Sequence, residues 1–110
     1  CRQTCGKSDC HMLTEHRDEM PESGHIAGGS WYDIPYGALV CADLTNLMAC
    51  GRCVSADQLA MASLRVMGPS MATGQAAGEA AALAAAKDGM TRAVDVNELQ
   101  RRLRANGAAV

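Results

Sequence analysis

The pattern of hydrophobic and polar positions divides the chain into an irregular first part and a more regular second part. Residues 1–30 are polar and show no regular apolar spacing, which predicts an irregular segment. Residues 31–40 carry many β-forming side chains around Pro35, which predicts an edge strand or two short extended pieces. The apolar run at 47–50 predicts a short buried strand, which Gly51 ends.

From residue 55 onward the apolar positions take a helical spacing. Ser55 has the side chain of an N-cap, and it predicts a helix over about 56–66. Gly68 and Pro69 interrupt this pattern, and proline suits the first turn of a new helix. We expect that second helix over about 69–88.

The last predicted element covers residues 95–106. Asp95 is followed three positions later by Glu98, which is a capping-box pattern, and Gly107 predicts the end of the helix. Its apolar stripe consists of Val96, Leu99 and Leu103. Residues 31–110 are therefore predicted to be mostly helical with a few short strands, within one domain.

The predicted helix over 69–88 has one face with almost no side chains. This face consists of Gly74, Ala77, Gly78, Ala81, Ala82 and Ala85. Two interior glycines cost about 1 kcal/mol each relative to alanine, which a helix tolerates where another backbone or a ligand must come close. No acidic residue offsets the partial positive charge of its N-terminus. Tight packing explains the pattern, and so does an N-terminus directed at a flavin carbonyl or a phosphate.

The turn at Gly51 carries two further candidate features. A strand that ends in glycine lets a cofactor approach the main chain, and Arg52 or Arg65 could then bind a pyrophosphate. A plain turn glycine with surface arginines is the alternative. Cys50 and Cys53 form a CxxC pair. We expect both to be small buried residues near the turn, with a redox pair or a metal site as alternatives.

Composition limits the classes of partner. The chain has 110 residues with 10 basic and 12 acidic side chains, so nothing in its charge favours nucleic acid or an anionic membrane. No apolar run approaches the roughly 20 residues needed to span a bilayer. Large aliphatic side chains are few and Phe is absent, so the core is poor. Because the chain also begins at Cys1, we expect a C-terminal piece that packs against the remainder of a longer polypeptide or an oligomeric partner.

Six cysteines and three histidines raise the question of metal or disulfide chemistry. No secretory context is visible, so reduced thiols in the cytoplasm are expected. A small cysteine-rich metal-binding or thiol-redox module is one alternative function, and a helical interaction or oligomerisation protein is another. Spacing alone would allow a metal site, although we expect none, from Cys1, Cys5, Cys10, His11 and His16.

Four ordered blocks of sequence carry a family resemblance. They are Trp31–Tyr36, Asn46–Ala56, Ser63–Met67 and Met71–Gly78. Together they resemble the C-terminal end of the FAD-dependent oxidoreductase family, which is related more distantly to the fumarate reductase and succinate dehydrogenase flavoproteins. The resemblance implies an α/β fold, namely the C-terminal part of a Rossmann-type FAD-binding domain, with FAD as the cofactor.

The resemblance also implies seven cofactor-binding residues. They are Gly51, Arg52, Ser55, Arg65, Ser70, Met71 and Ala72. Gly51 and Arg52 would lie by the pyrophosphate or the ribityl chain, with Ser55 and Arg65 near the cofactor. The other three would offer backbone amides to the edge of the isoalloxazine, where a helix N-terminus favours the anionic reduced flavin.

The chain departs from the family in two places. The GxGxxG fingerprint is missing, because the glycines at 24–29 neither follow a predicted strand nor open a predicted helix. Cys50 also stands where a small aliphatic residue is expected. We therefore expect a chain that contributes the flavin-facing turn and helix N-terminus, lacks activity alone, and depends on an N-terminal dinucleotide-binding part. The substrate and the catalytic residues are left unassigned.

Overall fold

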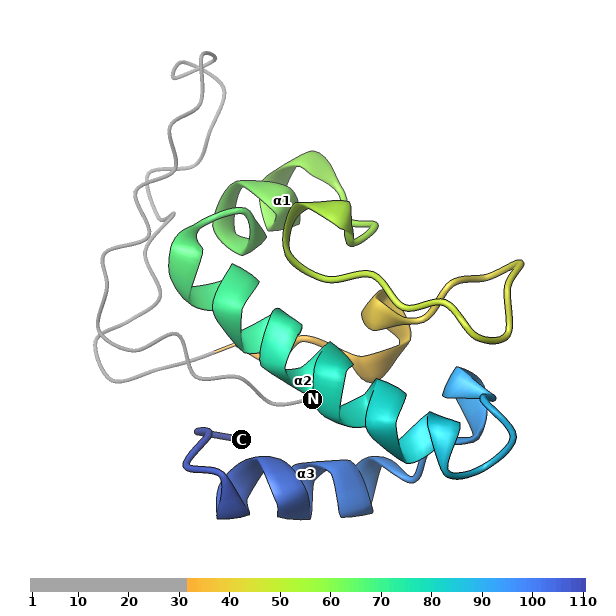
Figure 1. Ribbon diagram of the computed structural model, residues 1–110. Helices are drawn as coiled ribbons and strands as arrows, with labels where there is room; N and C mark the ends of the chain where they lie inside the picture. Colours follow the sequence, from red (N-terminus) through yellow and green to blue (C-terminus); the bar gives the residue numbers. More distant parts are fainter. Residues whose placement is uncertain (1–31) are drawn as a thin grey trace, which may run out of the picture.

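The computed structural model describes residues 32–110, which form a small helical assembly around one long helix. Three 3₁₀ helices and three α-helices follow in the order η1 (Tyr36–Leu39), η2 (Gly51–Cys53), α1 (Gln58–Leu64), α2 (Met67–Ala85), η3 (Thr91–Ala93) and α3 (Val96–Ala105). The helix α2 runs through the middle and contacts α1, η2, η3 and α3 (Figure 1). Of the helices described, none combines the length and apolarity needed to cross a bilayer.

Neither strand expected from the sequence forms in the described residues, although the backbone at Pro35 and Val40 is extended, as the alternative of two short extended pieces implies. Residues 36–39 form η1 instead, because the amide of Ala38 donates to the carbonyl of Pro35 and turns the chain. At 47–50 only Met48 pairs, in an isolated antiparallel bridge with Val40. A pairing this short has no further strand to extend it, so no ladder forms within residues 32–110.

The first α-helix begins later than predicted. Its N-cap is Asp57, whose carboxylate accepts a hydrogen bond from the amide of Ala60 at 2.8 Å, so Ser55 is not the cap. The backbone stays extended beyond η2 because Val54, with extended φ and ψ, is buried in the core. The helix α1 therefore covers only Gln58–Leu64.

The helix α2 begins two residues before Pro69, so the proline occupies the first turn as expected. Its buried residues are Pro69, Thr73, Ala76, Ala77, Ala80, Leu83 and Ala84. The face of glycine and alanine, for which close packing was one of two explanations, lies largely on the opposite side of the helix. Within residues 32–110, only Ala77 of that face is buried, Gly74 is half-buried, and the rest is exposed.

The helix α3 agrees with its sequence signals at both ends. The Asp95 carboxylate accepts from the amide of Asn97 at 2.9 Å and caps the N-terminus. At the C-terminus Gly107 has a φ of +80°, and the amide of Ala108 donates to the Leu103 carbonyl at 2.9 Å. This arrangement is a Schellman motif, which glycine accommodates without strain.

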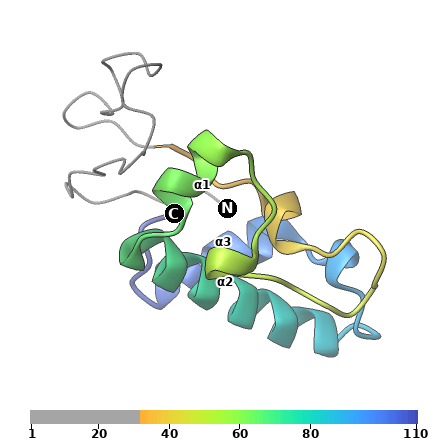
Figure 2. The same cartoon turned by 90° about the horizontal axis from the view of Figure 1, so that it is seen from above.

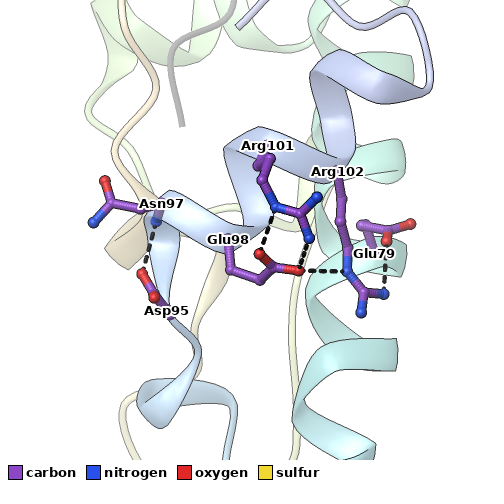
Figure 3. A network of polar contacts seen from close by, with 6 residues as sticks. All are labelled: Glu79, Asp95, Asn97, Glu98, Arg101 and Arg102. Atoms are coloured by element: carbon purple, nitrogen blue, oxygen red, sulfur yellow. Dashed lines mark hydrogen bonds and ion pairs between the residues drawn. The ribbon is translucent and has the colours of Figure 1, made fainter.

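Two kinds of contact hold α3 against α2. Leu99 and Leu103 are fully buried in the core with Ala76, Ala80 and Leu83 of α2. At the surface, Glu98 accepts hydrogen bonds from Arg101 and Arg102, and Arg102 reaches Glu79 of α2 at 3.3 Å (Figure 3). The three arginines of this helix, Arg101, Arg102 and Arg104, are exposed.

The loop at 41–47 is tied to η3 at the far end of α2. The carbonyl of Thr45 accepts from both the amide and the hydroxyl of Thr91, at 2.9 and 3.0 Å. The guanidinium of Arg92 donates to the carbonyls of Cys41 and Ala42. Tyr36 adds a hydrogen bond of 2.6 Å to the Thr91 carbonyl, and burial raises the pKa of this phenol.

Candidate functional site

The glycine turn singled out in the sequence is a closed turn from Cys50 to Cys53. The amide of Cys53 donates to the carbonyl of Cys50 at 3.2 Å. Gly51 has a φ of +58°, in the left-handed region that side chains disfavour. Glycine is therefore required here by the shape of the turn.

This turn lies directly against the N-terminal part of α2. The amide of Gly51 donates to Oγ1 of Thr73 at 3.0 Å. A Cβ atom added to Gly51 would meet the side chain of Ser70 at 3.6 Å, in ordinary contact. Viewed from above, η2 lies over the first half of α2 (Figure 2). The structure thus brings together two features that are about twenty positions apart in the sequence.

Thr73 was not predicted from the sequence, although it holds this junction. Its side chain is 2 % exposed, and its hydroxyl donates back to the carbonyl of Pro69 at 2.7 Å while it accepts from Gly51. A threonine four residues after a helix-opening proline commonly bonds back in this way. That spacing was the available signal.

The N-terminus of α2 presents other backbone amides than those predicted from the sequence. The Ser70 amide already donates to the carbonyl of Val66 at 3.1 Å, and Met71 and Ala72 lie further inside the helix. Because the N-cap of α2 is Val66 and Pro69 has no amide hydrogen, the amides that lack an intrahelical acceptor belong to Val66, Met67 and Gly68. The first turn contains no acidic residue, and no side chain caps it.

The two arginines that were predicted to bind the cofactor, Arg52 and Arg65, lie beside each other near the N-terminus of α2. Nε of Arg52 donates to the backbone carbonyl of Arg65 at 3.4 Å. Both side chains are exposed, and Arg65 follows directly after α1, next to the start of α2. Ser55 is also exposed, in the extended connection before α1. Gly51, Arg52, Arg65 and Ser70 are therefore grouped at this end, and Ser55 lies outside their hydrogen-bond contacts.

The expectation that the CxxC cysteines are buried is wrong. Cys50 and Cys53 are free and exposed, and Cys41 is free and half-buried. Among residues 32–110, no three His, Cys, Asp or Glu side chains are placed to hold a metal ion. The cysteines and histidines of residues 1–30 considered as metal ligands lie outside the described residues.

A comparison with protein-family models matches residues 4–103 to the family described as FAD dependent oxidoreductase. The chain belongs to this family. FAD is accordingly its cofactor, and oxidation–reduction is its class of chemistry. Searches among curated proteins and among solved structures each find no match.

The residues at the start of α2 have the chemistry to hold an anionic group. A bound group can reach the main chain here, because a Cβ added to Gly68 would meet nothing within 4 Å. The unsatisfied amides of the first turn suit a partial negative charge, and the neighbouring guanidinium groups suit a phosphate.

Proposed function

We propose that residues 50–72 form the flavin- and pyrophosphate-facing part of the FAD site in this oxidoreductase. The observation that carries the proposal is the junction of Gly51 with Ser70 and Thr73, which puts the arginine-bearing turn beside the open end of α2. Anionic groups bind at such helix ends because free amides and the helix dipole act together.

Each part of the junction has a separate role in this proposal. Arg52 and Arg65 pair with the pyrophosphate, while Ser55 lies near the cofactor. The amides of Met67 and Gly68, in place of those further along the helix, face the isoalloxazine edge together with the side chain of Ser70. FAD supplies the two-electron chemistry when bound, and the protein supplies fixed dipoles and charges around it.

The proposal includes a second polypeptide part that completes the site. The chain lacks a GxGxxG fingerprint, which in dinucleotide-binding folds opens the pyrophosphate cradle. The residues described also leave uncovered an apolar face of α2, in which Met67 is 83 % and Met71 76 % exposed. We assign this face to the dinucleotide-binding part of a Rossmann-type domain, so that the 110 residues alone are inactive.

Two finer expectations belong to the same proposal. A more distant relationship to the fumarate reductase and succinate dehydrogenase flavoproteins would place the site in a wider group of FAD enzymes. The free state of Cys41, Cys50 and Cys53 is compatible with a reducing compartment such as the cytoplasm.

Titration of the chain with FAD, followed by flavin fluorescence, tests the proposal. We expect weak saturable binding, and Arg52→Ala and Arg65→Ala should each weaken it about tenfold or more, because a charge-assisted hydrogen bond is worth about 1.5–3 kcal/mol. Lys87→Ala is the matched control, since this exposed cation follows the opposite end of α2.

Three outcomes would contradict parts of the proposal. No saturable binding up to about 1 mM FAD would exclude these residues as a cofactor surface. Equal losses of FAD affinity in all three variants would show that the arginines act only through a non-specific effect of charge. Tight binding with turnover by the chain alone would exclude the requirement for a second polypeptide part.

A further inference from the structure

Two exposed thiols lie at the ends of the closed turn. Cys50 and Cys53 are both free and exposed, and the amide of the second donates to the carbonyl of the first at 3.2 Å. The end residues of such a turn have Cα atoms within about 7 Å. A disulfide requires a Cα separation of about 4.4–6.8 Å. The turn therefore keeps the two residues close to the range of Cα separations in which a disulfide forms.

The shape of the turn is held by contacts that do not involve either cysteine side chain. Gly51 occupies its left-handed conformation and donates to Thr73 of α2 at 3.0 Å. Arg52 donates to the carbonyl of Arg65 at 3.4 Å. Both middle residues of the turn are therefore anchored, which keeps the two thiols close and raises the effective concentration of one relative to the other.

We propose that Cys50 and Cys53 are a reversible dithiol–disulfide pair that exchanges with low-molecular-weight disulfides such as oxidised glutathione. The thiolate of one cysteine attacks a sulfur of the small disulfide, whose S–S bond breaks, and one small thiol leaves. The second cysteine then attacks the protein sulfur of the mixed disulfide, and the second small thiol leaves. The protein dithiol loses two electrons and two protons, and the small disulfide gains both as two thiols.

Exposure and anchoring predict that the exchange is fast in both directions. Attack requires that a small disulfide reach the sulfur atoms, which the exposure of both cysteines permits. Exposed disulfides in small rings are the labile kind and are readily reduced again by thiols. Both cysteines lie within the range proposed for the FAD site, but the reaction needs no flavin, so the pair can be tested in the chain without FAD.

The experiment exposes the full chain to graded ratios of reduced and oxidised glutathione without oxygen, followed by acid quenching and alkylation. Trypsin cleaves after Arg52, between the two cysteines, so a disulfide leaves two peptides joined in the mass spectrum. We expect the joined peptides to increase with the oxidised fraction and to disappear when reduced glutathione is added in excess. Cys41 should be alkylated throughout the same range.

Cys50→Ser and Cys41→Ser are the matched variants. Without Cys50 the mixed disulfide on Cys53 loses the neighbouring thiol that resolves it, so its glutathione adduct should rise about tenfold or more over that of the unaltered chain. Cys41→Ser should form the joined peptides as before. Glutathione adducts on Cys53 at equal levels with and without Cys50 would overturn the proposal, as would two thiols alkylated at every ratio.

Discussion

Replacing Thr73 by valine removes one hydroxyl from the junction between the glycine turn and α2. Valine keeps the branched shape, but the half-buried amide of Gly51 loses its acceptor at 3.0 Å. An amide left without a partner costs about 1–3 kcal/mol, and the added methyl group recovers part of it. We expect a net loss of about 1–2 kcal/mol, which lowers the Tm by roughly 4–16 °C in a domain of this size.

Hydrogen exchange of the Gly51 amide, followed by NMR, distinguishes this mechanism from a general loss of packing. In Thr73→Val the amide should exchange markedly faster, whereas Thr73→Ser retains the acceptor and should keep the amide protected. Thr91→Val is the control for the substitution itself, because Thr91 is an equally buried threonine that bonds to Thr45 at the other end of the molecule. Unchanged exchange at Gly51 in Thr73→Val would refute the reasoning.

Two further predictions concern α3. Hydrogen bonds from Arg101 and then Arg102 lower the pKa of Glu98 from 4.5 to about 2, so the stability they provide is present above pH 4.5 and is lost as the pH falls through about 2. The urea midpoints of the unaltered chain and of Glu98→Gln should therefore differ near neutral pH and converge near pH 2; a constant difference would argue against the ion pairs. Leu103→Ala, at a side chain that is 1 % exposed, should lower the free energy of unfolding by about 2–5 kcal/mol. Leu44→Ala, at an exposed leucine, should change it by less than about 0.5 kcal/mol, and equal losses would show that the core is wrongly placed.

The helix α3 was predicted well because its signals are local. Asp95 and Gly107 act on backbone groups within a few residues, and Leu99 and Leu103 recur at the helical period. The segment at 47–50 was predicted poorly because a strand exists only through its partner. Its apolar residues favour extended backbone, but within residues 32–110 a single bridge is available to pair them.

Which face of α2 is buried could not be predicted from the sequence, for a different reason. Small residues surround this helix on nearly every side, so no one face is clearly more apolar than another. The choice is made by α3, whose leucines pack on Ala76 and Ala80 and leave Gly78 exposed. The family resemblance placed Gly51 and Ser70 near the same cofactor, without a contact between them. Their contact and the hydrogen bond from Gly51 to Thr73 required the coordinates.

The hydrogen-bonded contact between the 41–47 loop and η3 also bears on the order in which the chain folds. Thr45 and Thr91 are 46 positions apart, and closing so long a loop costs entropy before the contact repays it. The 19 residues of α2 form a rod of roughly 28 Å between these two positions in the sequence, and this rod carries η3 to the loop. We therefore expect the contact to form late in folding. Weakening it should then speed unfolding more than it slows folding.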